Sequence, residues 1–287
     1  MAGPQSAFAS LNGLRFHYVT DGPEDAPPVI LLHGFPEFWA GWRHQIPALA
    51  AAGYRVVALD QRGYNLSAKP PAIADYDLDY LVADVLALAA HLHIDTFHLV
   101  GHDWGAAVAW WLAGHHPERL RTLSILNVPH PAVMSRHLRS DLRQLFKSWY
   151  IFFIQLPWLP EFVLGVGDSA GLANLLRRSG KPSTFNTEER ARYRAAWRQP
   201  GARRAMLNWY RALMRRASRP FPLSKIQTPT QIIWGEQDVA LRLEMAEESL
   251  AYCEEAQLHC FPEATHWVQH DEAEQVNQLL LGFFHEN

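Results

Sequence analysis

The residues with the clearest chemical potential lie in LVGHDWGAAVAWW, at positions 99–111. Gly101 and Gly105 enclose Asp103 in a Gly-x-Asp-x-Gly frame that follows an apolar, strand-like run and opens a helix-like one. The same frame with serine at its centre forms the sharp strand-to-helix turn that carries the nucleophile of many hydrolases. An N-cap is the simpler interpretation of Asp103, but an N-cap does not need two flanking glycines. We therefore predict that Asp103 is a nucleophile.

Two further residues complete a catalytic constellation. His266 follows the last strand-like run, and Asp238, in WGEQD, follows the preceding one. Catalytic groups gather where parallel strands end, and the chain order nucleophile, acid, histidine is that of the α/β-hydrolase triad. The loop HGFPEFW also follows a strand-like run, so the backbone N–H groups of Phe35 and Trp104 are predicted to form an oxyanion hole. Pro36 in this loop is a candidate for a cis peptide bond.

A carboxylate nucleophile selects a different electrophile from a serine. It is already ionised at neutral pH, and it can displace a leaving group from an sp3 carbon to give an alkyl ester. His266, oriented by Asp238, can then activate the water that hydrolyses this ester. The leaving group is an epoxide oxygen, which needs an acid such as a tyrosine, or a halide, which needs N–H donors. The nucleophile alone leaves both open.

The elements that position these residues alternate as strands and helices. This alternation predicts an α/β fold with a mostly parallel central sheet and helices on both faces. The rhythm breaks at residues 129–222, which look helical throughout and carry many prolines, tryptophans and arginines. We predict a core domain of residues 1–128 and 223–287, with an inserted helical cap of residues 129–222. Ten arginines at positions 190–219 are read as a solvated helix face.

The composition bounds the classes of partner. The 287 residues carry a net charge of −3, which suggests neither nucleic acid nor an anionic membrane as a partner. The N-terminus lacks the form of a signal peptide, and no run reaches the ~18 apolar residues of a membrane span, so a cytoplasmic protein is expected. Two cysteines do not indicate a disulfide framework, and Cys260 is predicted to be a buried, inert thiol. No cofactor or metal is implied, and a homodimer is left open.

Several histidines outside the triad have structural interpretations. His33 and His102 are expected to support their loops, whereas His115, His116, His270 and His285 are expected at the surface.

The motifs HGFPEFW, DQRGYNLSAKP, GHDWG, WGEQD and THW together resemble the α/β-hydrolase-fold epoxide hydrolases, from about residue 8 to residue 284. Two segments of the expected cap, SWYIFFIQLPWLPE and LNWYRALM, resemble those that carry the tyrosines of that family. The resemblance implies that Tyr150 and Tyr210 hold and protonate the epoxide oxygen. The substrate would be a small apolar epoxide. Trp39, Phe152 and Trp267, with Phe35 and Trp104, are candidates for the apolar pocket wall.

Two alternatives remain beside this prediction. Haloalkane dehalogenases also have a tryptophan at the position of Trp104, but many place a halide-binding asparagine where this chain has Phe35. Fluoroacetate dehalogenases place arginines after the nucleophile and take the triad acid from the position of Asn127, so haloacid dehalogenation fits less well. The non-enzyme alternative is a ligand-binding protein on a hydrolase fold, which would not need His266 and Asp238 together.

Overall fold

A computed structural model describes residues 3–215, 221–222 and 224–287. Within these residues, eight strands form one sheet in the order β1-β2-β4-β3-β5-β6-β7-β8. Strands β3 to β8 run parallel, while β1 and β2 are antiparallel to their neighbours. The strand bounds are β1 Gln5–Leu11, β2 Leu14–Asp21, β3 Pro28–Leu32, β4 Arg55–Leu59, β5 Phe97–His102, β6 Leu120–Leu126, β7 Thr230–Gly235 and β8 Ala256–Phe261. The central strands β5 and β7 are buried along their whole length, as expected for a parallel sheet covered on both faces.

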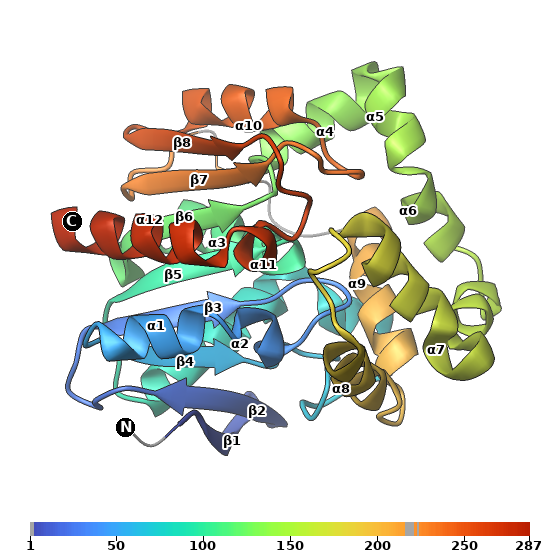
Figure 1. The fold of residues 1–287 in the computed structure, drawn as a ribbon, viewed down its shortest axis with the longest axis horizontal. Coiled ribbons are helices and arrows are strands. Elements are labelled where there is room, and N and C mark those ends of the chain that lie inside the picture. The colour runs from blue at the N-terminus through green and yellow to red at the C-terminus, as the bar shows by residue number, and fades with distance from the viewer. Residues whose placement is uncertain (1–2, 216–220, 223) are drawn as a thin grey trace.

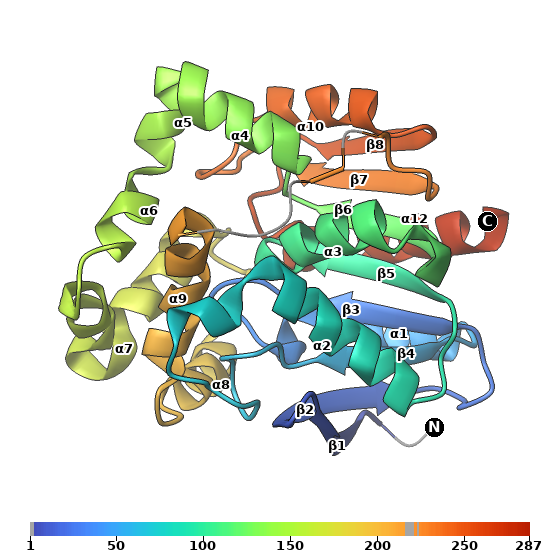
Figure 2. The same ribbon diagram turned by 180° about the vertical axis from the view of Figure 1, so that it is seen from behind.

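Helices cover both faces of the sheet (Figures 1 and 2). One face packs against α1 Gln45–Ala51, α11 Val268–Asp271 and α12 Ala273–Glu286; the other against α2 Leu78–His91, α3 Trp104–His115 and α10 Leu243–Ser249. Short 3-10 turns occupy Trp39–Trp42, Ile73–Tyr76, Pro117–Arg119 and Leu250–Tyr252. Two apolar cores result, one on each side of the sheet. The predicted α/β fold class is confirmed.

Helices α4 to α9 lie between β6 and β7, in the segment where the sequence predicts the cap. Their bounds are α4 Pro131–Ser140, α5 Leu142–Lys147, α6 Trp149–Ile154, α7 Leu159–Ser179, α8 Thr187–Trp197 and α9 Ala202–Arg215. Figure 1 shows them beside the carboxyl ends of the parallel strands. We call α4 to α9 the cap helices; that they form a separate domain with the boundaries given above stays a prediction.

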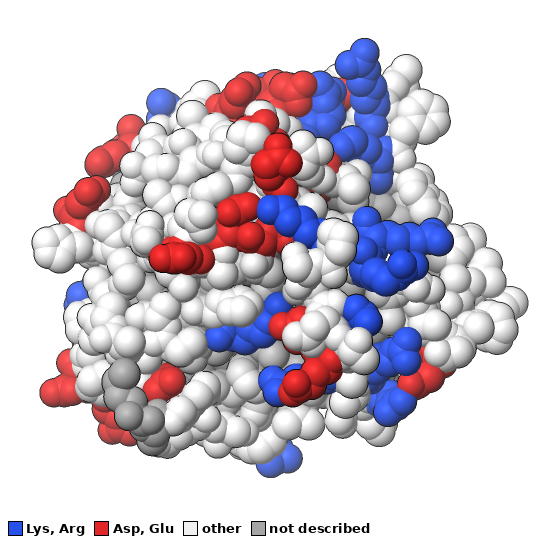
Figure 3. All heavy atoms as spheres, viewed as in Figure 1, with Lys and Arg blue, Asp and Glu red and all other residues white. Residues whose placement is uncertain are grey.

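The charged residues of the cap helices are only partly a solvated face. Arg192 and Arg198 are exposed and pair with Glu188 and Asp168. Arg211 departs from the prediction, because it is buried in an ion pair with Glu161 and also donates to the backbone of the α6–α7 turn. Arg216 and Arg219 lie outside the described residues. On the face shown in Figure 3, basic residues gather over the cap helices and acidic residues over the core.

The burial of two side chains corrects the sequence interpretation. Cys260 is exposed rather than buried, because β8 is the edge strand of the sheet. Partial desolvation of the thiol by its neighbours, with the nearby charges of Glu236 and Glu247, raises the pKa of Cys260, so it is protonated at neutral pH. His270, expected at the surface, has a fully buried ring. Within the described residues, no helix combines the length and apolarity that crossing a bilayer requires.

Candidate active site

Asp103 lies on a sharp turn between β5 and α3. Its backbone has φ 49 and ψ −122, and the side chain makes no cap hydrogen bond, so the N-cap interpretation fails. The turn needs its glycines, since a Cβ on Gly105 would lie 2.0 Å from the Leu32 carbonyl oxygen. A Cβ on Gly101 would lie 2.6 Å from the Gly105 carbonyl oxygen. The frame therefore lets α3 pack directly against the sheet with the carboxylate at its N-terminus.

The structure brings the three predicted triad residues together. The Nδ1 of His266 lies 2.7 Å from Asp238 Oδ2, and its Nε2 lies 3.6 Å from Asp103 Oδ2. Asp238 is buried, and its other oxygen accepts hydrogen bonds from the backbone N–H groups of Ala240 at 2.7 Å and Leu241 at 3.0 Å. The imidazole thus has one nitrogen bound to a fixed carboxylate and the other facing the turn.

Asn127, at the end of β6, holds the triad acid in place. Its amide donates to Asp238 Oδ2 at 2.9 Å and to the Gly235 carbonyl at 3.2 Å, and accepts from the Gly235 N–H at 2.9 Å. From the sequence, Asn127 is only a position that lacks the acid of the fluoroacetate dehalogenases. Its place at a strand end was the signal that could have identified it.

The charges of Asp103, Asp238 and His266 shift one another's pKa values. Burial opposes ionisation of Asp103 and Asp238, but His266 holds the pKa of both carboxyls below the ordinary value. Burial would lower the pKa of His266, yet Asp238 and Asp103 together raise it to about 10. The imidazole is therefore protonated while both carboxylates are charged, and loses part of that stabilisation when either charge is removed.

One of the two predicted oxyanion-hole donors already binds the carboxylate of the nucleophile. The Phe35 N–H donates to Asp103 Oδ1 at 2.6 Å, which leaves Oδ2 as the oxygen on the His266 side. Trp104 is the first residue of α3, so its N–H belongs to the free helix N-terminus. The Phe35–Pro36 peptide bond is cis, as suggested by the sequence.

The two cap tyrosines meet above this turn. The Tyr210 ring packs edge-on against Trp104 at 4.9 Å and Phe35 at 5.4 Å between centroids, and Tyr150 lies 5.9 Å from Tyr210. Burial raises the pKa of both phenols, and the negative charge of Asp103 raises it further. Helices α6 and α9 therefore place two neutral O–H groups in the field of the nucleophile.

The three candidate wall residues have different surroundings. Trp267 is buried beside the triad histidine, at 5.0 Å between rings, and its indole donates to Ser179 in α7. Trp39 is partly buried against the core. Phe152 is half exposed, because α6 turns Ile151 and Ile154 inward instead, so it does not have the burial of a pocket wall.

A buried polar network around Glu37 lies behind the site, and the sequence alone did not predict it. Glu37, from the HGFPEFW loop, accepts from the Tyr193 hydroxyl, lies 2.8 Å from His270 Nε2 and accepts from the Gln269 amide at 3.1 Å. Burial opposes its ionisation, but His270 and His102 hold the pKa of Glu37 well below the ordinary value. This carboxylate links α8 of the cap to α11 and to the back of the triad. An acidic residue among aromatics at a strand end was the available signal.

His102 supports the loop of the triad histidine, as expected, with Nε2 2.9 Å from the His266 carbonyl oxygen. His33 likewise lies in its loop, where Nε2 accepts from the Gln61 N–H at 3.1 Å.

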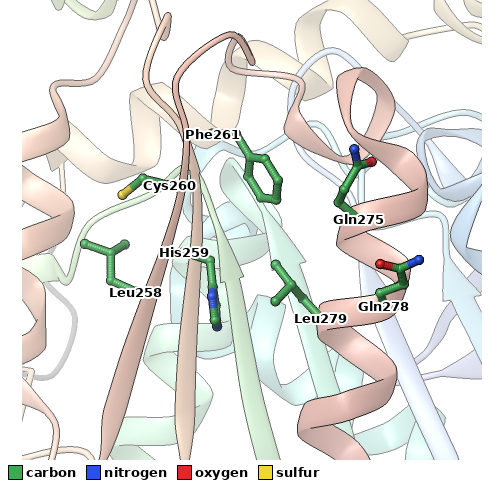
Figure 4. A pocket seen from close by; sticks show the side chains of 7 residues that line it. All are labelled: Leu258, His259, Cys260, Phe261, Gln275, Gln278 and Leu279. Carbon is green, nitrogen blue, oxygen red and sulfur yellow. The ribbon is translucent and has the colours of Figure 1, made fainter.

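A surface depression of about 480 Å³ lies away from this chemistry. Figure 4 shows it between β8 and α12, with His259 and Phe261 turned toward α12 and Cys260 turned away. Its lining residues include none of the triad and none of the cap helices, so the depression is separate from the candidate active site.

Comparison with known proteins places this geometry in a family. Residues 27–273 match the family described as alpha/beta hydrolase fold, so the chain belongs to that family. It is 44% identical to the AB hydrolase superfamily protein YfhM of Bacillus subtilis over 99% of both chains. It is 38% identical to human epoxide hydrolase 4, covering 96% of this chain and 77% of that protein.

Solved structures similar to this chain include epoxide hydrolases. An epoxide hydrolase from Bacillus megaterium, in complex with an inhibitor, superposes with a TM-score of 0.90 at 32% identity, over 97% of this chain and 100% of that one. Epoxide hydrolase A from Mycobacterium thermoresistibile gives a TM-score of 0.87 at 29% identity, over 98% of each chain. The protein is a hydrolase of the epoxide hydrolase group.

Proposed function

We propose that this protein opens epoxides to vicinal diols through a covalent ester on Asp103. The observation that carries the proposal is the pair of neutral tyrosines, Tyr150 and Tyr210, placed on the nucleophile's side of the cap. A carboxylate alone would serve several leaving groups, but an epoxide oxygen leaves as an alkoxide and needs O–H donors. The epoxide hydrolases among the similar proteins support the same substrate class.

In the first step, Asp103 Oδ2 attacks one ring carbon of the epoxide. The bond between that carbon and the ring oxygen breaks, and its electron pair stays on the oxygen. Tyr150 and Tyr210 donate to this oxygen, and one of them transfers a proton to it. The Phe35 N–H holds Asp103 Oδ1 away from the reacting carbon, so the two carboxylate oxygens have separate roles.

In the second step, water attacks Cγ of the ester. Esterification removes the Asp103 charge, which lowers the pKa of His266, so the imidazolium releases its proton to solvent. The neutral imidazole then acts as the base that removes a water proton. Asp238 stabilises the imidazolium that forms. Negative charge develops on Oδ1, where the N–H groups of Phe35 and Trp104 stabilise it. The diol leaves with the proton returned by His266. The regenerated Asp103 carboxyl releases its proton to solvent, and the tyrosine and His266 regain theirs from solvent.

A direct comparison of substrates tests the proposal. Purified protein is incubated separately with styrene oxide and 1-chlorohexane, and diol and chloride are both measured. We expect diol from the epoxide and no chloride above the uncatalysed rate, since Phe35 supplies no side-chain N–H for a halide. Chloride release without diol formation would assign the protein to the dehalogenases instead.

A further inference from the structure

The first turns of the cap expose an unusual amount of apolar surface. Of the fifteen large apolar side chains that the structure exposes among the described residues, nine lie between residues 142 and 166. Isolated exposed apolar residues are ordinary, but contiguous ones mark an interaction surface. We call the six most exposed of this group the apolar strip: Leu142, Phe146, Trp149, Trp158, Phe162 and Val166.

Helix α5 and the start of α6 are inverted in polarity. Leu142, Phe146 and Trp149 follow one another at helical spacing and face solvent at 70%, 76% and 63% exposure. On the inner side, Gln144 and Ser148 are buried and hydrogen-bond to each other at 3.0 Å. Polar side chains thus occupy the inner face. Because the described residues leave the apolar face uncovered, we look for its partner outside the chain.

Charge indicates what that partner is. The net charge of −3 conceals a strong asymmetry: residues 129–222 contain 17 Lys and Arg against 5 Asp and Glu, whereas the rest contains 9 against 24. Figure 3 shows the uncharged rim at the right, where Figure 1 places α5 to α7, with basic side chains beside it. Three exposed arginines of this region, Arg143, Arg177 and Arg178, make no ion pair with any described acidic residue.

We propose that the apolar strip is a docking surface for an anionic lipid bilayer. Exposed tryptophans flanked by arginines are the composition that favours the boundary between lipid headgroups and acyl chains. A second copy of this chain fits less well, because pairing two strips face to face would bring two strongly basic caps together. The net charge of the whole chain does not reveal this asymmetry.

The position of the strip connects it to the active site. Trp149 directly precedes Tyr150 on α6, so one of the helices that carry the strip also contributes to the candidate active site. If the substrate is an apolar epoxide, as the proposed function holds, it concentrates in the lipid at this surface. Binding to vesicles is measured without any substrate, so its outcome does not depend on that proposed activity.

The test uses the full chain and sonicated vesicles of phosphatidylcholine, alone or with 30% phosphatidylglycerol. Trp149 and Trp158 are the two exposed tryptophans of the eleven in the chain, so tryptophan emission reports on the strip. We expect a blue shift and sedimentation with the anionic vesicles, both weakened by 0.5 M NaCl. Brominated lipid should quench the emission, and Trp149→Phe with Trp158→Phe should remove that quenching.

Two matched pairs of variants separate the apolar and charged contributions. Phe146→Gln with Phe162→Gln should reduce the partition coefficient at least tenfold, whereas Phe8→Gln with Tyr80→Gln, exposed on the core, should not. Each arginine near an anionic surface strengthens binding about fivefold, so reversing Arg143, Arg177 and Arg178 to Glu should weaken it at least about a hundredfold. Arg121→Glu on the core is the charge control. Circular dichroism and melting curves confirm that each variant is folded.

Absence of binding to anionic vesicles by the folded wild-type protein would overturn the proposal. Equal binding to neutral and anionic vesicles would overturn its electrostatic part. Concentration-dependent dimerisation in analytical ultracentrifugation, abolished by Phe146→Gln with Phe162→Gln and unaccompanied by vesicle binding, would assign the strip to a second copy instead.

Discussion

Replacing Asn127 by glycine should slow hydrolysis of the ester without slowing its formation. Asn127 has φ 49, and glycine accepts this conformation without strain, so the substitution removes the side chain alone. It deletes the donor to Asp238 Oδ2 and both bonds to Gly235. Ester formation depends on Asp103 and the tyrosines, whereas ester hydrolysis depends on His266 oriented by Asp238.

The hydrogen bonds of Asn127 give the expected magnitude. A hydrogen bond to a charged group contributes about 1.5–3 kcal/mol and a neutral one about 1 kcal/mol. Asp238 keeps its donors from Ala240 and Leu241, so it remains ionised and loses one of three fixed contacts. The three lost bonds together should lower the free energy of unfolding by about 3.5–5 kcal/mol. The hydrolysis rate should fall about tenfold, equivalent to about 1.4 kcal/mol of barrier.

Stopped-flow tryptophan fluorescence under single-turnover conditions can resolve the two steps, because Trp104 adjoins the nucleophile. Asn65→Gly is the matched control. Asn65 also has positive φ and donates to a buried carboxylate, Asp60, at 2.7 Å, but outside the triad. An Asn127→Gly enzyme that forms the ester slowly and hydrolyses it at the normal rate would refute the assigned role.

Three other predictions follow from the same geometry. Tyr150→Phe and Tyr210→Phe should each lower kcat/KM for styrene oxide at least tenfold. The double variant should lower it at least about a thousandfold, since general-acid catalysis contributes about 10²–10⁴-fold. Full activity in the double variant would refute the donor assignment. Because the folded-state pKa of His266 is raised to about 10, its stabilising effect is complete below the unfolded pKa near 6.5 and is lost as pH rises through about 10. Urea unfolding should therefore show a fall in stability between these pH values that is smaller in His266→Gln, and parallel curves for the two proteins would contradict the assignment. Glu37→Gln should lower the free energy of unfolding by about 3 kcal/mol, because it disrupts a buried charge and its partners, whereas Glu188→Gln, in an exposed pair, should change it by less than about 1 kcal/mol.

The sequence predicted the elements whose signals are local. The glycines around Asp103 indicate a turn in which backbone segments approach closely. The buried strand runs before Asp238 and His266 placed both residues at one sheet edge. The fold class followed from the same alternation of strands and helices. Each of these inferences needed only nearby residues and the rule that parallel strands end together.

The sequence interpretation failed where burial depends on distant partners. His270 lies on a short helix and reads as a surface residue, but Glu37, more than two hundred positions away, buries it. Cys260 lies in an apolar run, yet its strand forms the edge of the sheet. Phe152 and the residues of the apolar strip resemble core residues at helical spacing, and only the structure shows that polar Gln144 and Ser148 occupy the inner face.

The covalent ester on Asp103 is the central claim, and single turnover in ¹⁸O-labelled water tests it most directly. Enzyme in molar excess over styrene oxide is digested after one turnover, and mass spectrometry is applied to the diol and to the peptide containing Asp103. The account predicts that the diol takes its new oxygen from the unlabelled carboxylate and that one ¹⁸O appears in Asp103. Label in the diol and none in Asp103 would mean that water opens the ring directly, and would contradict the account.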